Sequence, residues 1–402
     1  MNVLVVNAGS SSLKYQLFDT DNGNVKAKGN CERIGIDGLL THKVPGREDY
    51  VLKTDMKNHE EAVKNVIAAL TDKTVGVVSS MKEIEAVGHR VVHGGPYFTK
   101  SVLVDDDVME KLELCTDIAP LHTPPAIMGI RGCIAAMPGV PQVLVFDTAF
   151  HQTMPPEAYI YPVPYEYYEK YGVRRYGFHG TSHRYVSGEM QKLFDKPMKE
   201  TRIITCHLGN GSSISAVKNG KVIDTTMGFT PLDGLMMGTR CGSVDPAIVP
   251  FIMEKENMTP KQANEMLNKK SGFFGISGGK SDCRDIFAGI KAGDERCKLA
   301  VDILCYQIKK YIGAYTAAMG GLDAIVFTAG IGENTPENRE KCLEGLEFLG
   351  IDLDRDVNAN VPRPITTTRL SSEKSKVLVY LIPTNEELVI AKDTAEIVGK
   401  LK

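Results

Sequence analysis

The feature that most constrains the fold is a strand–loop–strand pattern that occurs twice in this chain of 402 residues. Residues 3–20, "VLVVNAGSSSLKYQLFDT", read as an apolar strand, a Gly/Ser loop and an alternating strand, and an Asp-Asn-Gly turn leads to a third strand. Residues 202–226, "RIITCHLGNGSSISAVKNGKVIDTT", repeat this order about two hundred positions later. Because each copy opens one half of the chain, the repeat predicts a duplicated domain.

The two Gly/Ser loops are candidates for phosphate binding. Gly and Ser are ordinary turn residues, so a plain hairpin is the alternative. Backbone N–H groups in such a loop point into one concavity and bind anions, and Lys14 adds a point charge beside the first loop. The first loop is not a Walker loop, because the G-x-x-x-x-G-K-[ST] spacing is absent and a strand follows it. Two such loops facing each other would grip a phosphate chain from both sides, so the repeat favours phosphate binding.

The composition is that of an ordinary soluble globular protein, with 43% hydrophobic and 24% charged residues. The net charge of -3 and the lack of a long basic run argue against a nucleic-acid or membrane partner. No apolar stretch reaches transmembrane length, and the N-terminus reads as a strand and not as a secretory signal. The nine cysteines are dispersed, without metal-type pairs, and indicate reduced thiols. We therefore expect a cytoplasmic protein.

A third glycine cluster lies in residues 322–339, "LDAIVFTAGIGENTPENR". The pattern predicts a buried strand over 324–327, a glycine-rich turn at 330–334, and a helix with Thr335 as its N-cap and Pro336 at its first position. A glycine-rich turn at the carboxyl end of a strand is where open α/β sheets bind nucleotides. The alternative is a strand-to-helix turn without a ligand.

Three charged residues stand in apolar or glycine-rich segments. Arg90 lies inside the apolar strand of "AVGHRVVHGG" (86–95), where a buried guanidinium needs an anionic partner. That partner is either a structural carboxylate or a bound carboxylate or phosphate, which suits the guanidinium fork. Asp147 ends the apolar strand of "QVLVFDTAFH" (142–151), and Arg240 lies between glycines in "GLMMGTRCGSVDP" (234–246). We interpret both as site candidates.

His179 and His183 in "GFHGTSH" (177–183) have the i, i+4 spacing of two ligands on a helix. A zinc site is disfavoured, because the Glu of H-E-x-x-H is missing and the segment holds no third ligand.

With these motifs together, the chain resembles the acetate and butyrate kinase family. "VLVVNAGSSSLK" and "AVGHRVVHGG" look like its two signatures. Further segments match in order: "VFDTAFH", "YGFHGTSH", "HLGNGSS", "LMMGTRCGSVDP", "SGGKSDCRD" and "PTNEELVIA". The resemblance covers essentially the whole chain, and Pro96, where a charged residue is common, is the one departure noted.

This resemblance implies the actin-like, ribonuclease H-like α/β fold of the acetate and sugar kinases. Two domains of duplicated β-β-β-α-β-α-β-α plan would close on a nucleotide cleft. The first domain would be residues 1–150, completed by a C-terminal helix at 385–402, and the second 151–384. The sequence agrees, since an apolar strand over 377–382 precedes a good helix start at Thr384-Asn385-Glu386-Glu387.

The resemblance also implies the reaction, the reversible transfer of the ATP γ-phosphoryl group to acetate, giving ADP and acetyl phosphate by direct in-line transfer. It implies Mg²⁺, with Mn²⁺ as an alternative, and a homodimer.

The family's functional positions carry over residue by residue. The phosphate and metal region matches Asn7, Ser10, Ser12 and Lys14, with Asn7 and Glu386 as the metal ligands. The second phosphate loop matches His207, Leu208, Gly209, Asn210 and Gly211. The adenosine side matches Asp282, Cys283, Arg284, Gly330, Ile331, Gly332, Glu333 and Asn334. Arg90 matches the carboxylate-binding residue, and the methyl pocket matches Val92, Leu121, Phe178 and Pro231. His179 and Arg240 match the transition-state stabilisers, and Asp147 matches the active-site acid.

The chemistry of the acceptor limits the role of Asp147. A carboxylic acid with a pKa of roughly 4 is already ionised at neutral pH and needs no general base. We therefore expect Asp147 to orient Mg²⁺ or its waters.

Two rival functions remain at this point. A propionate or butyrate kinase would differ only in pocket volume. An actin-like or chaperone-like ATPase would share the fold, but a cleft that activates water would not need Arg90 and Arg240.

Overall fold

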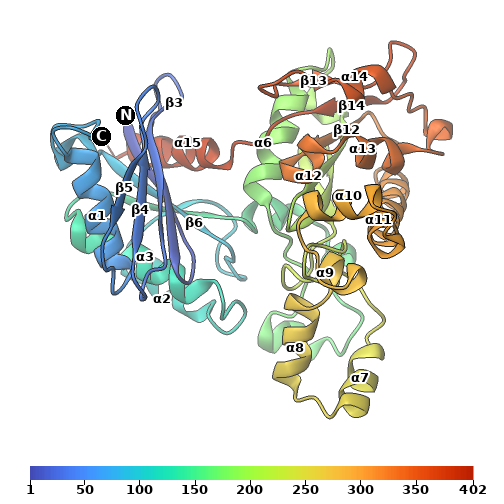
Figure 1. Cartoon of the computed structure of the whole chain (residues 1–402), viewed down its shortest axis with the longest axis horizontal. Coiled ribbons are helices and arrows are strands. Elements are labelled where there is room, and N and C mark those ends of the chain that lie inside the picture. Colours follow the sequence, from blue (N-terminus) through green and yellow to red (C-terminus); the bar gives the residue numbers. More distant parts are fainter. Residues whose placement is uncertain (402) are drawn as a thin grey trace. The chain divides into compact units, whose positions relative to one another are not determined.

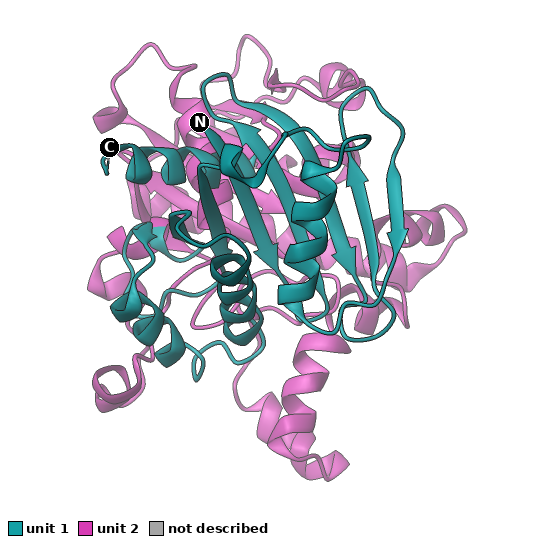
Figure 2. Cartoon of the chain, turned by 90° about the vertical axis from the view of Figure 1, so that its left-hand side faces the viewer, with its two compact units in different colours: residues 1–149, 385–402 teal, residues 150–384 magenta. Residues whose placement is uncertain are grey.

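The computed structural model describes residues 1–401, which form two compact units (Figure 1). Unit 1 comprises Met1–Ala149 and the C-terminal segment from Asn385, and unit 2 comprises Phe150–Thr384. Figure 2 draws the two units in separate colours. In the described part of the chain, no helix is long and apolar enough to cross a membrane.

Unit 1 is an eight-stranded mixed sheet with helices on both faces. Its strands are β1 (Asn2–Ala8), β2 (Ser12–Asp19), β3 (Asn24–Glu32), β4 (Leu39–Lys43), β5 (Tyr50–Lys53), β6 (Ala86–Val91), β7 (Val102–Leu103) and β8 (Gln142–Phe146). Its helices are α1 (His59–Thr71), α2 (Asp106–Leu114), α3 (Thr123–Ala136) and α15 (Glu386–Gly399). The strand order is β5-β4-β3-β2-β1-β6-β8-β7, with β1, β6 and β8 parallel.

Both faces of the central strand β1 are buried, as its continuous run of apolar residues predicts. Leu4 and Val6 pack into a core with α1 and α3, while Val3 and Val5 pack against α15. In β2 the alternation predicted from the sequence is confirmed. Leu13, Tyr15 and Leu17 are buried in the first core, and Lys14 is exposed.

Unit 2 repeats the sheet with more helices. Its strands are β9 (Arg202–Leu208), β10 (Ser212–Lys218), β11 (Lys221–Thr225), β12 (Ala324–Thr328), β13 (Thr368–Arg369) and β14 (Leu378–Leu381). The helices before the last part of its sheet are α4 (Pro156–Tyr159), α5 (Glu166–Tyr171), α6 (Gly180–Gln191), α7 (Ile248–Glu256), α8 (Pro260–Lys269), α9 (Gly272–Ser277), α10 (Cys283–Lys291) and α11 (Glu295–Met319). The remaining helices are α12 (Ala329–Asn334), α13 (Pro336–Leu343) and α14 (Arg355–Ala359).

The order β11-β10-β9-β12-β14 in unit 2 reproduces β3-β2-β1-β6-β8 in unit 1. In both sheets the first three strands are antiparallel and the next two continue in parallel. The duplication predicted from the two strand–loop–strand segments is therefore present as two matching half-sheets.

Each sheet is covered on one face by a helix that follows, in the sequence, the last parallel strand of the other sheet. Helix α6 comes after β8 and packs on β9 and β12. Helix α15 comes after β14 and packs on β1, β6 and β8. The approach of α15 is close at Gly88, where an added Cβ would lie 2.8 Å from Ile390 Cγ2.

The prediction of a glycine-rich turn at residues 330–334, after the strand β12, is wrong. Gly330–Asn334 belong to α12, which begins directly after β12. Ala329 takes a left-handed φ of 65°, and its N–H donates to Glu333 Oε1 over 2.9 Å, which closes the helical turn. Thr335 does occupy the N-cap position of α13, with Pro336 in the first turn, although its side chain makes no capping hydrogen bond.

Candidate active site

Three predicted site residues of unit 1 gather at one edge of its sheet. The parallel register pairs Val6 with His89 and Val91 with Phe146, so the carboxyl ends of β1, β6 and β8 lie at the same edge. Asn7, Arg90 and Asp147 all stand at these ends, which is where open α/β sheets bind ligands.

Arg90 and Asp147 form a bidentate ion pair. Arg90 Nη2 donates to Asp147 Oδ2 over 2.7 Å, and Arg90 Nε donates to Oδ1 over 3.1 Å. The Asp147 side chain is 1% exposed, whereas the Arg90 side chain is 22% exposed and so remains partly accessible. The Asp147 carboxylate raises the pKa of Arg90 against the effect of burial, and Glu386 and Glu387 at the start of α15 add to this. Arg90 therefore remains a fixed positive charge.

The first Gly/Ser loop is a tight turn that is also held by a side chain of helix α1. Gly9 N donates to Ser12 O over 2.8 Å, and His59 Nε2 on α1 donates to Gly9 O over 2.6 Å. Ser10 is exposed at the tip. Beside the loop, a pocket of about 220 Å³ is lined by Asn7, Lys14 and Glu387, among others.

The oxygen donors at this edge suit a hard divalent cation. Asn7 ends β1, and the Glu386 carboxylate lies near enough to Arg90 to raise its pKa. Mg²⁺ prefers oxygen ligands and is usually held by one or two carboxylates plus substrate phosphates. Asn7 and Glu386 fit this preference.

The second Gly/Ser loop, between β9 and β10, is one residue shorter than the first, since Leu208 pairs with Ser212 whereas Ala8 pairs with Leu13. Gly209 N donates to Gly211 O over 3.1 Å and lies 3.2 Å from Ser212 Oγ. His207 is nearly buried at the end of β9.

Arg240 and His179 converge on this second loop. A Cβ added at Gly211 would lie 2.5 Å from Arg240 Nη2 and 3.4 Å from His179 Nε2. Arg240 Nη1 donates to Pro231 O over 2.7 Å, which fixes the guanidinium, and burial lowers its pKa. His179 occupies the N-cap position of α6 with a left-handed φ of 58°. The geometry thus places a cation and an imidazole over the loop glycine.

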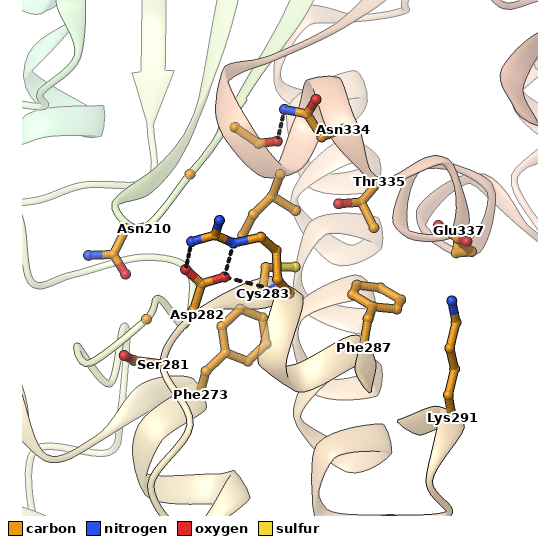
Figure 3. A pocket seen from close by; sticks show the side chains of 15 residues that line it. Asn210, Phe273, Ser281, Asp282, Cys283, Phe287, Lys291, Asn334, Thr335 and Glu337 are labelled. Atoms are coloured by element: carbon orange, nitrogen blue, oxygen red, sulfur yellow. Dashed lines mark hydrogen bonds and ion pairs between the residues drawn. The ribbon is translucent and has the colours of Figure 1, made fainter. Parts of the chain in front are cut away.

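A larger pocket of about 750 Å³ lies in unit 2 and is drawn in Figure 3. Eight predicted nucleotide residues line it: Gly209, Asn210, Asp282, Cys283, Arg284, Gly330, Ile331 and Asn334. The sequence did not assign the other lining residues to a nucleotide site: Gly238, Phe273, Ser281, Phe287, Lys291, Thr335 and Glu337. Phe287 and Lys291 follow Cys283 at four-residue intervals on α10, and this helical spacing was the signal that could have found them.

The carboxylate of Asp282 organises the mouth of this pocket. It caps α10 by accepting from Arg284 N over 2.8 Å, and it accepts from Arg284 Nη2 over 2.7 Å. These hydrogen bonds lower the pKa of Asp282 to about 2. Burial raises the pKa of Cys283 to about 11, so its thiol is protonated at neutral pH.

Two residues predicted for the adenosine side, Gly332 and Glu333, do not line the pocket. The Glu333 carboxylate accepts a hydrogen bond from Ala329 N at the start of the same helix, and Thr384 N lies 3.4 Å from the same oxygen. Its observed contacts hold the β12–α12 connection together.

The four residues predicted for the methyl pocket are divided between the units. Val92 is half-buried and Leu121 is 65% exposed in unit 1. Phe178 is buried in unit 2, and Pro231 is the residue that accepts from Arg240.

With this geometry in place, the chain can be compared with known proteins. Residues 2–392 match the sequence model of the Acetokinase family. The chain belongs to the acetokinase family.

Individual relatives are similar to this chain along its full length. The acetate kinase of Thermoanaerobacter pseudethanolicus is 61% identical over 100% of both chains. The crystal structure of Porphyromonas gingivalis acetate kinase has a TM-score of 0.94 at 48% identity and covers 99% of both chains. That of a propionate kinase from Francisella tularensis has a TM-score of 0.91 at 40% identity, covering 98% of this chain and 99% of that one. The family resemblance and the duplicated actin-like fold expected from the sequence are confirmed.

Unit 2 also contains a histidine–hydroxyl cluster, which the sequence motifs taken singly do not reveal. Rings of His179 and His207 stack with centroids 4.1 Å apart, and His183 and His151 lie behind them. Ser213 Oγ lies between His179 and His183 and contacts both rings. Among residues 1–401, no group of three or more His, Cys, Asp or Glu side chains is placed to hold a metal ion.

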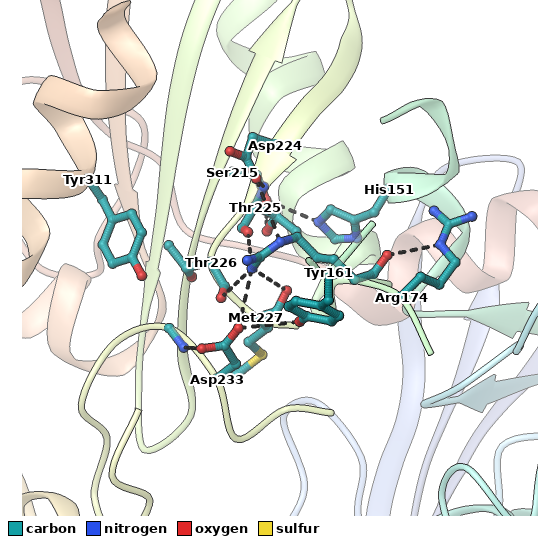
Figure 4. A network of polar contacts seen from close by, with 12 residues as sticks. His151, Tyr161, Arg174, Ser215, Asp224, Thr225, Thr226, Met227, Asp233 and Tyr311 are labelled. Atoms are coloured by element: carbon teal, nitrogen blue, oxygen red, sulfur yellow. Dashed lines mark hydrogen bonds and ion pairs between the residues drawn. The ribbon is translucent and has the colours of Figure 1, made fainter. Parts of the chain in front are cut away.

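Arg175, four residues before His179, braces the loop that carries Pro231 and Arg240. Its Nη1 donates to the carbonyls of Thr225 and Thr226 over 2.9 and 3.0 Å and lies 3.5 Å from Asp233 Oδ2. These three partners are labelled in Figure 4. The end of β11 and the start of the loop are thereby tied to one guanidinium.

Proposed function

We propose that this acetokinase transfers the γ-phosphoryl group of ATP to acetate, reversibly, giving ADP and acetyl phosphate. The observation that carries the proposal is the convergence of Arg240 Nη2 and His179 Nε2 on Gly211 in the second Gly/Ser loop. Phosphoryl transfer depends on alignment and on donors aimed at the charge of the transferring group. A fixed guanidinium and an imidazole over a loop rich in backbone N–H groups supply such donors.

The two substrates are both anions, so their approach is the main electrostatic problem. Arg90 would bind the acetate carboxylate, and Lys14, Ser10 and Ser12 would contact the phosphates with the loop 207–211. The contacts of Asp147 support a role in positioning: both its oxygens accept from Arg90. Since acetate is already ionised, Asp147 need not abstract a proton.

Members of this family use ATP with a divalent metal ion. We infer that the ion is Mg²⁺, with Mn²⁺ as a substitute, and that Asn7 and Glu386 hold it. Such an ion neutralises phosphate oxygens and orients the transferring group.

The pocket in Figure 3 would hold the adenosine. Apolar side chains of Phe273, Phe287 and Ile331 suit a purine face, and Asp282 and Arg284, which also line the pocket, would contact its polar groups. Gly332 and Glu333 would act by shaping the backbone of this pocket. The acetate methyl would lie against Val92, Leu121, Phe178 and Pro231.

The setting of the enzyme is also a proposal. All nine cysteines, each within residues 1–401, are free thiols, which supports a cytoplasmic location. We infer a homodimer, which sedimentation of the purified chain would test.

The test is a hydroxylamine trap for acyl phosphate, run with ATP, Mg²⁺ and acetate, propionate or butyrate in parallel. We expect acetate to give the highest kcat/KM, with propionate lower by about 10–200-fold, the range for one methylene. Arg240→Leu should lose about 10²–10³ in kcat, because it removes a transition-state donor. ATP hydrolysis without any trapped product would contradict the proposal and favour the ATPase alternative.

A further inference from the structure

One face of the unit 2 sheet changes from apolar to polar along its strands. Antiparallel pairing places Ser213 opposite His207 and Ser215 opposite Thr205, so these four side chains share the face that α6 covers. Farther along the same strands this face is apolar, with Ile203 and Val217 packed against α6. The polar band therefore lies at the end of the sheet that carries the second Gly/Ser loop.

Four side chains of this region form a continuous line of hydrogen bonds. Thr205 Oγ1 lies 2.7 Å from His183 Nδ1, His183 Nε2 lies 2.7 Å from Ser213 Oγ, and Ser213 Oγ lies 2.8 Å from His179 Nδ1. Thr205, His183 and Ser213 are fully buried. The line starts inside the unit and ends at the ring whose Nε2 faces Gly211.

The number of protons in this line leaves two arrangements. Each hydroxyl donates one hydrogen, and each neutral imidazole donates from one nitrogen and accepts at the other. Either every bond donates toward His179, which then carries its proton on Nε2, or every bond donates away from it, which puts a proton on His179 Nδ1. Ser213 Oγ could instead accept from both rings, but its own buried hydrogen would then have no acceptor, because among the described residues Ser213 Oγ contacts only these two ring nitrogens.

The position of Thr205 favours the first arrangement. If the line ran toward Thr205, its hydroxyl hydrogen would be left with the Ser215 carbonyl at 3.5 Å, a contact too long to be a good hydrogen bond. If the line runs toward His179, the same hydrogen goes to His183 Nδ1 at 2.7 Å. A buried donor that loses its acceptor is costly, so the arrangement that donates toward His179 is the more stable one.

His183 can accept from Thr205 at Nδ1 and donate to Ser213 from Nε2 because its ring stays neutral. Burial lowers the pKa of His183 well below its usual value, and the neighbouring His151 and His207 act in the same direction. A charged ring would donate from both nitrogens and would break the line at Thr205.

We propose that Thr205, His183 and Ser213 are positioning residues that hold His179 in the Nε2–H tautomer, as a donor toward the phosphoryl-binding loop. None of the three needs to touch a substrate. The inference rests on the proposed function only for its kinetic consequence; the tautomer itself can be read without any reaction.

The direct test is the ¹⁵N spectrum of the His179 ring. The chain has nine histidines, so labelling histidine alone gives few signals, and those missing in His179→Gln identify the residue. We expect Nε2 of the wild type to resonate as a protonated nitrogen and Nδ1 as an unprotonated one at neutral pH. A wild-type His179 protonated on Nδ1, alone or on both nitrogens, overturns the proposal.

Two pairs of variants test the line itself. Ser213→Ala should lower kcat about 100-fold with little change in either KM, because the ring loses its orientation. Ser215→Ala is the matched control: its hydroxyl is also buried on β10, but lies 3.0 Å from His151 Nε2. Thr205→Val should lower kcat about tenfold and mix the His179 tautomers, while Thr205→Ser, which keeps the hydroxyl, should restore both.

The outcomes separate positioning from simple stability. Equal losses of kcat in Ser213→Ala and Ser215→Ala, or a Thr205→Val enzyme with an unchanged His179 spectrum, would refute the proposal. If Ser213→Ala does not fold, the Thr205 pair and the wild-type spectrum decide. A wild type that forms no acyl phosphate contradicts the proposed function, while its spectrum still tests the tautomer.

Discussion

At the scale of single residues, the site depends on the absence of a side chain at Gly211. Gly211 leaves open the space on which Arg240 Nη2 and His179 Nε2 converge, and its backbone φ lies outside the left-handed region. An alanine would therefore fit the backbone at this position, and only the two functional groups would be disturbed.

We predict that Gly211→Ala lowers kcat about 100-fold, because an added Cβ 2.5 Å from Arg240 Nη2 forces the guanidinium to move. The melting temperature should change little. Gly188→Ala on α6 is the matched control, because a Cβ there meets no atom within 4 Å. Steady-state kinetics of both variants check the prediction, and equal activities would mean that Arg240 is not needed where it lies.

His89 predicts a pH dependence of stability. Burial lowers its pKa from 6.5 to about 4, against the hydrogen bond that it makes with Gln142. Between these pH values the unfolded chain binds a proton at this site and the folded chain does not, so stability is lost as pH falls through this window. The loss should reach about 3 kcal/mol at about pH 4.

His89→Gln should flatten this dependence, because an amide beside Gln142 does not titrate. The measurement is the melting temperature at pH 7 and pH 4.5 for both proteins. His183, whose pKa is also lowered, acts in the same direction and stays present in the variant. An unchanged drop in the variant would assign the acid sensitivity to other groups.

At the scale of elements, the long helix α11 shows how the same residue type serves two purposes. Gly313 lies in its interior, whereas Gly320 is its C-cap with a left-handed φ of 73°. A Cβ at either position would meet no atom within 4 Å, so packing is equal and only the backbone differs.

We predict that Gly313→Ala stabilises unit 2 by about 0.5–1 kcal/mol, since glycine in a helix interior is less favourable than alanine. Gly320→Ala should destabilise it by about 1–2 kcal/mol, because the left-handed conformation strains a residue with a Cβ. Urea unfolding of the two variants gives the comparison. Effects of the same sign would show that local conformation does not decide stability here.

The elements also show what the sequence could and could not predict. Alternation in β2 and the turn residues after it were readable, because side-chain direction in a strand has a period of two. Helix α12 was missed because Gly330 and Gly332 are typical of turns, and the clamp from Glu333 to Ala329 N is a tertiary detail. The line from Thr205 to His179 joins residues far apart in the sequence, and only the pairing of β9 with β10 brings them together.

At the scale of the whole molecule, the chain leaves unit 1 at Ala149 and returns at Asn385. Helix α15 then covers one face of the first sheet with Ile390, Ala391 and Val398, which are at most 3% exposed. Burying such side chains contributes about 1.5–3 kcal/mol each, and a domain has only about 5–15 kcal/mol in total.

We predict that deleting residues 385–402 unfolds unit 1 and leaves unit 2 folded. Amide hydrogen exchange, read peptide by peptide, should show lost protection in β1, β6 and β8 but retained protection in β9 and β12. Deletion of residues 400–402 alone is the control and should change neither unit. Full protection of β1 in the longer deletion would mean that α15 is not needed for unit 1.

The return of the chain to unit 1 has a consequence for biosynthesis. The ribosome makes the first sheet early, but the helix that covers its second face emerges only after all of unit 2 has been made. At roughly 5–20 residues per second, the face of Val3, Val5 and Phe18 stays uncovered for roughly 10–50 s. The unit that is translated first is therefore the last to be completed, and a nascent chain of this protein exposes an apolar sheet to chaperones for most of its synthesis.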